Sequence, residues 1–243
     1  MLCNYLIHSF MYSLEELENG KIFLIDKPLD WTSFDVVNKI KWQIRKHFKL
    51  KKFKVGHAGT LDPKATGLLV VCVGKATKQI QEIQDASKIY SGTIKLGVQT
   101  PSYDTETEEI NHKNVFHLSE KQVIETTKAF IGEILQKPPV FSAIKKDGKR
   151  LYELARKGQE VEIAERAVTI YDFQITKVDF PFVEFLIHCS KGTYIRSLAN
   201  DFGNKLEVGG YLTQLHREKI GNFDVKDADN SIIEKEDFLS EFL

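Results

Sequence analysis

The pattern of hydrophobic and polar positions predicts buried strands and amphipathic helices along most of the chain. Residues 21–27, KIFLIDK, form a short apolar run closed by Pro28, which is typical of a buried strand. Thr32, with Asp35 three positions further on, has the pattern of a capping box and predicts the start of a helix. The apolar side chains of this helix lie at helical spacing: Phe34, Val37, Ile44 and Phe48.

The same pattern predicts further elements in the middle of the chain. The run LLVVCVG (68–74) indicates a strand buried on both faces, and IYSGTIKLGV (89–98) indicates another strand. An acidic, turn-rich loop follows at 100–109, and residues 119–135 have the periodicity of an amphipathic helix that begins at Ser119. Residues 183–189, VEFLIHC, alternate like a half-buried strand.

Loops and short helices connect the remaining segments. The paired prolines of KPPVFSAIKKDGKR (137–150) predict a loop, LYELARKG (151–158) a short helix, and KGT (191–193) the start of a helix. That last helix contains Tyr194, Leu198 and Phe202. Because strands are joined by loops as well as by helices, we predict an α+β fold. It consists of a mixed, largely antiparallel sheet with flanking helices.

Length and composition indicate one large domain of 243 residues. We assign residues 11–225 to this domain, residues 1–10 to a disordered or alternative start before Met11, and residues 226–243 to a short tail or helix. No apolar run approaches the ~20 residues that span a bilayer. The three cysteines have neither disulfide nor zinc spacing, which predicts a reduced, cytoplasmic protein.

Two local patches of basic residues stand out, because the formal net charge of the whole chain is zero. Such patches can neutralise phosphates, and aromatic side chains among them can stack on bases. The alternative is a solvated helix face with core aromatics, and the first patch alone favours it. Two patches flanking glycine-rich loops shift the balance modestly towards RNA. The patches comprise Lys41, Arg45, Lys46, Lys49, Lys51, Lys52 and Lys54, interleaved with Trp42, Phe48 and Phe53, and then Lys145, Lys146, Lys149 and Arg150.

A single carboxylate, Asp62, lies inside the stretch KVGHAGTLDPKATGLLVVCVGKATK (54–78). Gly56 and Gly59 permit backbone angles closed to other residues, and Pro63 biases Asp62 away from helical geometry. The acid is therefore expected at the exit of a rigid loop, ahead of a buried strand. From spacing alone, a turn aspartate that caps its own backbone is the commoner case. The GKAT segment (74–77) lacks the upstream glycine of a phosphate-binding loop.

The whole stretch resembles the TruB family of tRNA pseudouridine synthases. The family pattern Gly-His-x-Gly-x-Leu-Asp-Pro-x-Ala-x-Gly, leading to Gly-x-Ala-Thr-Lys, is matched by GHAGTLDPKATG (56–67) and GKATK (74–78). Further matches follow in the family's order and cover roughly residues 20–225. They are DKP (26–28) with WTSFDVV, KIYSGTIKLGVQTPSYDTE (88–106), KPPVFSAIKKDGKRLYELARKG (137–158), CSKGTYIRSLANDFG (189–203) and YLTQLHREKIGNF (211–223).

The resemblance implies the pseudouridine synthase fold, with a site in a central cleft, and an isomerase that acts on uridine 55 in the T arm of tRNA. The N1–C1′ bond breaks, the flipped uracil rotates, and C5 bonds to C1′. This chemistry requires no cofactor and no metal. Asp62 matches the catalytic aspartate, and either covalent attack or a glycal intermediate is open. Arg196 matches the arginine that pairs with this aspartate, and Tyr90 matches the tyrosine that stacks on the uracil and is a candidate for removing the C5 proton.

Other positions match the family's substrate-binding residues. His57 matches the loop histidine that contacts RNA where the base has left the stack, and Tyr194 and Leu215 match an aromatic and an apolar residue of the pocket. Lys27 matches a lysine near the pocket that supports the active-site loops or a phosphate, although a surface lysine is nearly as common. Asp104 matches an aspartate near the substrate-binding loop.

The resemblance also implies what surrounds the catalytic domain. Many relatives have a C-terminal RNA-binding domain of the PUA type, and only about twenty residues follow the GNF of 221–223, so we expect this domain to be missing. We predict the T stem-loop of tRNA as the partner, no required protein partner, no membrane, and a monomer. The alternative function is a tRNA-folding chaperone of the same fold without catalysis. A guide-RNA-dependent enzyme fits longer, tailed chains.

Overall fold

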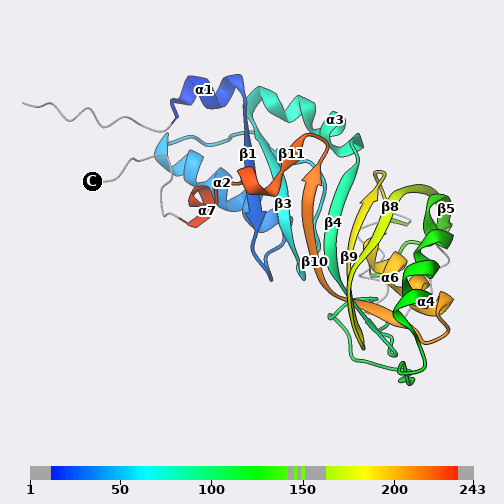
Figure 1. The fold of residues 1–243 in the computed structure, drawn as a ribbon. Helices are drawn as coiled ribbons and strands as arrows, with labels where there is room; N and C mark the ends of the chain where they lie inside the picture. The colour runs from blue at the N-terminus through cyan, green and yellow to red at the C-terminus, as the bar shows by residue number, and fades with distance from the viewer. Residues whose placement is uncertain (1–11, 142–144, 147–148, 151–162, 235–243) are drawn as a thin grey trace, which may run out of the picture. The chain divides into compact units, whose positions relative to one another are not determined.

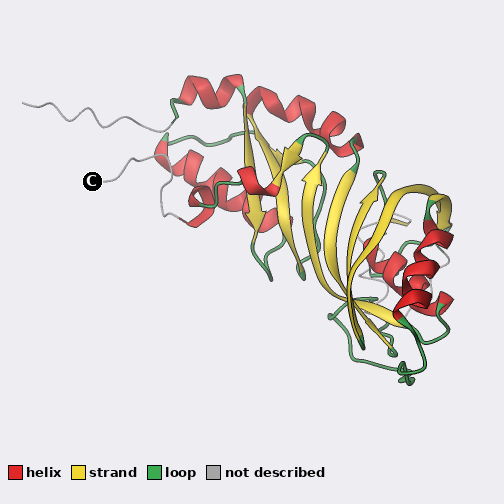
Figure 2. Ribbon diagram, in the orientation of Figure 1, coloured by secondary structure: helices red, strands yellow, loops and turns green. Residues whose placement is uncertain are grey.

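The computed structural model describes residues 12–141, 145–146, 149–150 and 163–234. The chain divides into two compact units, one formed by Met1–Ala86 with Glu218–Leu243 and the other by Ser87–Arg217. Figure 1 traces the chain through both, and Figure 2 shows that each combines strands with helices. None of the helices in the described ranges is long and apolar enough to cross a membrane.

The first unit is built around strand β3 (Ala65–Val73). It pairs antiparallel with β1 (Lys21–Lys27), in a register that places Lys21 opposite Val73 and Lys27 opposite Gly67. The short strand β2 (Val55–His57) also pairs antiparallel with β3. Strand β11 (Phe223–Asp224) pairs with the end of β10 (Gly210–Ile220), the strand in which the chain returns to this unit. The strands predicted at 21–27 and 68–74 are confirmed.

Strand β3 is apolar on both faces because both faces are covered. Leu69, Val71 and Val73 belong to one core cluster, together with side chains of β1, α2 (Ser33–His47) and α7 (Ser231–Glu234). Leu68, Val70 and Cys72 point to a second cluster, which includes Ala58, Ala76, Ile83 and Ile220. All of these β3 residues are fully buried. The unbroken apolar run in the sequence is therefore the consequence of packing on two sides.

Helix α2 confirms the predicted capping box. The Thr32 hydroxyl accepts a hydrogen bond from the backbone N–H of Asp35, whose carboxylate accepts one from the N–H of Thr32. Val37 and Ile44 are buried as expected and Phe48 packs against the same core, but Phe34 is 65% exposed. Phe34, at the first helical turn, lies outside the buried stripe formed by Val36, Val37, Ile40 and Ile44.

The other helices of this unit are short, and α7 packs the C-terminal segment against β1 and the core. They are α1 (Leu14–Asn19), the 3-10 helix η1 (Gly74–Gln79), α3 (Ile80–Asp85), the 3-10 helix η3 (Val225–Asp227) and α7. Asn230 accepts a hydrogen bond from the Asp26 N–H at 2.9 Å and donates one to the Asp26 carbonyl at 3.0 Å. Ile232 and Ile233 of α7 are buried in the first core cluster, so residues 226–234 belong to the packed unit.

The second unit contains the strands in the order β10, β4, β9, β8, β5. Their bounds are β4 Lys88–Leu96, β9 Phe182–Cys189, β8 Arg166–Asp179 and β5 Gly132–Gln136. The pairs β4–β9, β8–β9 and β5–β8 are antiparallel, as predicted for most of the sheet. A separate two-stranded ribbon pairs β6 (Lys145–Lys146) with β7 (Lys149–Arg150). The strands predicted at 89–98 and 183–189 are confirmed, whereas no element was predicted for β8.

Helices α4 (Glu120–Thr127) and α6 (Ile195–Lys205) lie side by side at the end of the sheet where β5 and β8 run (Figure 1). Between sheet and helices lies a cluster of phenylalanines, in which the Phe173 ring of β8 is 5.3 Å from the Phe202 ring of α6. Phe130 contacts both of these rings, and Phe185 contacts that of Phe173 edge-on. This aromatic core fixes α6, and with it the residues at its N-terminus.

The helix predicted over 119–135 is only partly right. It begins at Ser119 as expected, where the structure shows a capping box with Gln122, but it ends at Thr127, followed by the 3-10 turn η2 (Lys128–Phe130) and strand β5. Gly132 has a φ of +100°, which no right-handed helix accommodates. The residues after it pair with β8, a partner more than thirty positions away that no local pattern reveals. The helix predicted at 151–158 and residues 1–10 lie outside the described residues.

Candidate active site

Asp62 lies in a loop whose backbone is held on both sides of it. The Ser33 hydroxyl accepts a hydrogen bond from the Leu61 N–H at 2.8 Å and donates to the Leu61 carbonyl at 3.1 Å, within a buried environment. On the other side, the Pro63 carbonyl accepts from the Asp30 N–H at 2.9 Å. The Asp62 carbonyl itself closes a turn by accepting from the Ala65 N–H at 3.0 Å, directly before β3. Asp62 is half-buried at the exit of a rigid loop, as its sequence context predicted.

Lys27 is a second brace of this loop and is fully buried. Its ammonium donates to the carbonyls of Pro28 at 2.8 Å, Trp31 at 2.6 Å and Pro63 at 3.4 Å. Burying an ammonium is costly unless its donors are satisfied, and here backbone oxygens satisfy them. The alternative of a surface lysine is therefore wrong, and the contact with Pro63 supports the predicted role of Lys27 in holding the active-site loop.

The two glycines before Asp62, Gly56 and Gly59, differ in their backbone conformation. Gly59 has a φ of +99°, which L side chains rarely adopt, as the sequence predicted. Gly56 lies in strand β2, where a Cβ would come within 2.8 Å of the Ile80 Cδ1, the end of a flexible side chain that can move aside. His57 ends β2 and is half-buried, and its carbonyl accepts from the Gln84 side chain at 3.4 Å. The prediction of an unusual backbone angle at Gly56 is wrong.

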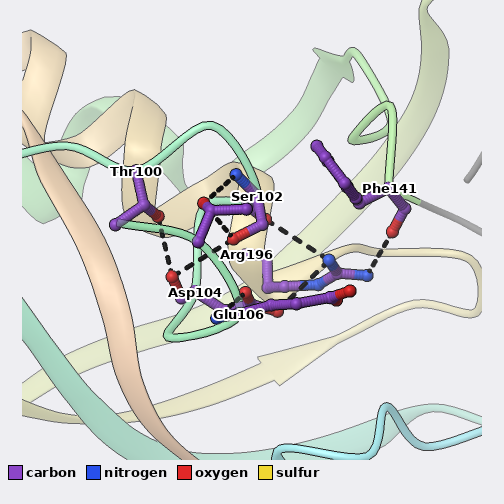
Figure 3. A network of polar contacts seen from close by, with 7 residues as sticks. Thr100, Ser102, Asp104, Glu106, Phe141 and Arg196 are labelled. Carbon is purple, nitrogen blue, oxygen red and sulfur yellow. Dashed lines mark hydrogen bonds and ion pairs between the residues drawn. The ribbon is translucent and has the colours of Figure 1, made fainter. Parts of the chain in front are cut away.

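Arg196, in the first turn of α6, is the centre of a buried polar network in the second unit (Figure 3). Its Nη1 lies 3.3 Å from the Asp104 Oδ2 and donates to the Ser102 carbonyl at 3.3 Å. Its Nη2 donates to the Phe141 carbonyl at 2.9 Å. The side chains of Arg196 and Asp104 are only 4% and 7% exposed. The planar guanidinium thus joins two loops that lie far apart in the sequence, a task suited to its fork of donors.

Asp104 is itself fixed by the loop that contains it. The hydroxyls of Thr100 and Ser102 donate to the Asp104 carbonyl at 2.8 and 3.2 Å, and the Glu106 N–H donates to the Asp104 Oδ1 at 2.9 Å (Figure 3). Its other carboxylate oxygen faces Arg196. The substrate-binding role predicted for Asp104 stays a prediction, and the contact that the structure gives it is with the catalytic candidate Arg196.

Tyr194 is the N-cap residue of α6 and has no side-chain capping bond of its own. Its backbone is bound at both polar atoms by the side chain of Gln136, and the guanidinium of Arg166 lies 4.5 Å from the centre of its ring. Tyr90 is buried in β4, opposite Ile187 of β9, and Leu215 is half-buried in β10.

The predicted site residues are therefore divided between the units. Lys27, His57 and Asp62 lie in the first unit, where Lys27 reaches the loop of Asp62 through Pro63. Those of the second unit are Tyr90, Asp104, Tyr194, Arg196 and Leu215, and the structure brings Asp104 and Arg196 into contact. The pairing of Asp62 with Arg196 stays a prediction.

The first basic patch is exposed on and after α2. Trp42 is 51% exposed, and the Lys46 ammonium lies 4.7 Å from the centre of its ring. Phe48 and Phe53, by contrast, pack against the core. The interpretation as core aromatics therefore holds for Phe48 and Phe53. The interpretation as a nucleic-acid surface fits Trp42 and the surrounding lysines, which can accept an anionic partner.

The two described cysteines, Cys72 and Cys189, are buried thiols. Burial raises the pKa of each to about 11, so both are protonated at neutral pH and neither has the thiolate that nucleophilic catalysis requires. Within the ranges that the structure describes, no three histidine, cysteine or acidic side chains gather into a group that could hold a metal ion.

Sequence reasoning missed the residues that hold the site in place. Ser33 lies within the WTSFDVV match but was given no role, and Gln136 and Arg166 belong to no motif; Gln136 follows directly after a segment that was predicted to be helical. The carbonyl of Phe141 is equally invisible, because any residue supplies one. No local signal identifies such residues, since their partners lie far away in the sequence.

Comparison with known proteins places this arrangement in context. Residues 45–195 match the model of a family described as TruB family pseudouridylate synthase, N-terminal domain. A protein from Flavobacterium johnsoniae, named tRNA pseudouridine synthase B, is 55% identical over 88% of this chain and 94% of its own length. A protein of the same name from Chloroherpeton thalassium is 51% identical over 89% of this chain and 90% of its own length.

Solved structures show the same similarity. A Cbf5–Nop10–Gar1 complex contains a chain that is 30% identical, with a TM-score of 0.63 over 88% of this chain and 54% of the other. An archaeal box H/ACA sRNP Nop10–Cbf5 complex contains a chain that is 25% identical, with a TM-score of 0.64 over 93% and 57%. The chain thus spans little more than half the length of these structural neighbours.

Proposed function

Because the chain belongs to the TruB family of pseudouridylate synthases, we propose that it isomerises uridine 55 in the T arm of tRNA, with Asp62 as the catalytic carboxylate. Its curated relatives are tRNA pseudouridine synthases matched over nearly their whole length, so the chain is an isomerase that forms pseudouridine in tRNA. The fold predicted from the sequence, that of the pseudouridine synthases, is confirmed by the structural neighbours.

The observation that carries the proposal is the way in which Asp62 is held. A turn aspartate that merely caps its own backbone needs no support from other segments. Here the residues before and after Asp62 are fixed by a buried hydroxyl and a buried ammonium, those of Ser33 and Lys27. Such support presents a side chain in a fixed position, which is what a catalytic group requires.

The reaction that we assign to Asp62 conserves every atom of the nucleoside. The bond between N1 and C1′ breaks, the uracil rotates, C5 bonds to C1′, and the proton on C5 moves to a base and finally to N1. A carboxylate facing the sugar can attack C1′ covalently, or it can act as the base that removes the C2′ proton and so forms a glycal intermediate as the N1–C1′ bond breaks. Both routes require Asp62 to be ionised.

Arg196 is the group we assign to that requirement. A guanidinium near a carboxylate favours its charged form. Arg196 is buried and already oriented by Asp104, Ser102 and Phe141, so it approaches any further acceptor in a fixed position. In this proposal Tyr90 stacks on the uracil and removes the C5 proton, while Tyr194 and Leu215 complete the pocket.

The substrate must also be bound and its base extracted. Flipping a nucleotide out of a folded loop costs about a few kcal/mol. We propose that His57 occupies the space left in the RNA, and that the exposed lysines around α2 neutralise backbone phosphates. The tRNA substrate and the cysteine usage support the cytoplasm as the site of action, and we propose a monomer that needs no protein partner.

The experiment that tests this proposal compares Asp62→Asn with the parent protein on a T-arm stem-loop RNA. Pseudouridine is mapped by carbodiimide modification and primer extension. The parent should modify position 55, and Asp62→Asn should bind the RNA but lose the reaction by ~10⁴-fold or more. Asp30→Asn is the matched control, because the side chain of this exposed neighbour forms a surface ion pair with Lys64 and the change leaves its backbone bond to Pro63 in place. An active Asp62→Asn protein would remove Asp62 from the mechanism.

The same variant separates catalysis from the alternative function. A tRNA-folding chaperone that needs no chemistry would refold tRNA equally well with Asp62→Asn. A parent protein that refolds tRNA but leaves position 55 unmodified would favour that alternative over the isomerase.

A further inference from the structure

The last cross-strand pair of the β5–β8 ladder consists of Gln136 and Arg166, directly opposite each other. Both side chains reach the segment that leads into α6, where Tyr194 and Arg196 lie. Neither residue belongs to any of the sequence motifs. Their shared target makes this end of the sheet a candidate support for that segment.

Gln136 binds the backbone of Tyr194 at two points. Its amide nitrogen donates to the Tyr194 carbonyl at 3.0 Å, and its amide oxygen accepts from the Tyr194 N–H at 2.8 Å. Gln136 is fully buried, so these bonds do not compete with water. Among side chains of this size, only the glutamine amide offers both a donor and an acceptor. An ionised glutamate has no donor, and methionine has neither a strong donor nor a strong acceptor.

Arg166 binds the side chain of Tyr194 and the turn before it. The centre of its guanidinium lies 4.5 Å from the centre of the Tyr194 ring, a cation–π distance, and its Nη2 donates to the Gly192 carbonyl. Gly192 has a φ of +82°, so this turn has an unusual backbone that Arg166 helps to fix. One residue thereby constrains both the ring and the turn.

The next residues of α6 are bound by the segment that follows Gln136. The Ser197 hydroxyl donates to the Lys137 carbonyl at 2.8 Å, and Arg196 donates to the Phe141 carbonyl at 2.9 Å. The chain from 136 to 141 therefore contacts three positions at the start of α6, 194, 196 and 197, and Gln136 is where this contact begins.

We propose that Gln136 and Arg166 are positioning residues for catalysis, which hold the Tyr194 ring and, through the shared backbone, the guanidinium of Arg196. This inference rests on the proposed function, because it takes Tyr194 and Arg196 to be part of the uridine pocket. A displacement of about 1 Å in such a group can cost ~100-fold in rate. Gln136 and Arg166 contact the segment at the N-terminus of α6, whereas the Phe173 and Phe202 rings hold the body of that helix. Changing the pair should therefore affect the reaction more than the packing of the helix.

The test is a double-mutant cycle between Arg166 and Tyr194, read as single-turnover rate at saturating T-arm RNA and, separately, as RNA affinity. Arg166→Met should lower the rate about ten-fold and leave the affinity within about two-fold. In a Tyr194→Phe background, which keeps the ring, the same change should again lower the rate. In a Tyr194→Leu background it should have a clearly smaller effect, because the ring is already gone and only the contact of Arg166 with the Gly192 carbonyl is left to lose.

Two further variants exclude a merely structural role. Gln136→Glu keeps the size and one acceptor but loses the donor to the Tyr194 carbonyl, and should lower the single-turnover rate. Arg166→Lys keeps the charge without the planar stacking group, and should fall between parent and Arg166→Met. Lys177→Met is the control, since this exposed lysine lies on the same strand and should match the parent.

Three results would overturn the proposal. A weaker RNA affinity with an unchanged rate would make Arg166 a phosphate contact. Additive effects of Arg166→Met and Tyr194→Leu would show that the two residues do not act together. A lower unfolding temperature with an unchanged rate per folded molecule would leave only a structural role. Because the parent and Asp62→Asn are measured in the same assay, each of these results is distinct from a failure of the proposed function.

Discussion

The loop that contains Asp62 and the segment that contains Arg196 are held by different kinds of contact. Asp62 is flanked by partners from the preceding part of the same unit, with Ser33 28 positions from Leu61 and Lys27 36 positions from Pro63. Arg196 depends on partners from loops 55 and 94 positions away, and Tyr194 on Gln136, 58 positions away. The Asp62 loop is held by a hydroxyl and an ammonium that bind its backbone, whereas the Arg196 segment is held by a buried ion pair, by backbone carbonyls and by the side-chain amide of Gln136.

This difference indicates how each candidate group obtains its properties. The Asp62 loop receives rigidity, because a hydroxyl and an ammonium fix the residues on either side. The Arg196 segment receives rigidity together with a fixed charge, because Asp104 compensates part of a guanidinium that is almost fully buried. Changes near Asp62 should therefore act mainly through position, and changes near Arg196 through charge and position together.

Among the changes that test this comparison, Arg196→Lys is expected to have the largest effect. A lysine keeps the positive charge but cannot reach Asp104 and the Ser102 and Phe141 carbonyls with one ammonium. We expect the single-turnover rate on bound RNA to fall about 100-fold. Lys205→Met, an exposed change at the other end of α6, serves as the control. A rate close to that of the parent would show that charge alone matters at this position.

A smaller effect is expected when Lys49, Lys51 and Lys52 are changed together to glutamate. These exposed lysines of the first unit are proposed to contact phosphates, so KM should rise about ten-fold and depend less on salt, with single-turnover chemistry on bound RNA nearly intact. The control is charge reversal of Lys121 and Lys128, two exposed lysines of the second unit that lie in α4 and directly after it. Equal effects of the two variants, or an unchanged KM, would remove the first patch from the binding surface.

The smallest effect on the rate is expected for Lys27→Met. Three backbone carbonyls lose their donor, which should lower the free energy of unfolding by about 1–3 kcal/mol. The rate should fall only several-fold, because Ser33 still holds the loop on the other side of Asp62. Lys64→Met should leave stability within about 0.5 kcal/mol, since its pair with Asp30 is exposed. Denaturant unfolding and single-turnover kinetics measure both quantities.

The comparison also explains which parts of the fold could be predicted from sequence. Strand β1, the capping box at Thr32, the helix start at Ser119 and the buried strand β3 were all predicted. Each depends on neighbours within a few positions or on simple hydrophobicity. Strand β5 was mistaken for the end of a helix, because Val123, Thr127 and Phe130 continue a helical spacing up to Gly132. Its strand character comes from pairing with β8, a long-range contact.

The site shows the same division. The resemblance located Asp62 and Arg196 within conspicuous motifs, and the buried surroundings of Lys27 and Asp104 emerged only in the structure. The supports of the second unit, Gln136 and Arg166, could not be found because a single glutamine or arginine gives no periodic or spacing signal. Residues that act by touching another residue far along the chain are visible only after folding.

The two-sided burial of β3 has a consequence for alignment. Because both faces of this strand are apolar, a slip by one residue would exchange one set of buried aliphatic side chains for another, so hydrophobicity alone hardly opposes it. The hydrogen bond from the Gly67 N–H to the Asp26 Oδ1, at 3.0 Å, is a polar lock that a shifted strand would break. Each step of such a shift would carry the preceding aspartate about 3.3 Å along the sheet. By fixing the register of β3, the side chain of Asp26 also sets the position of Asp62 along the sheet.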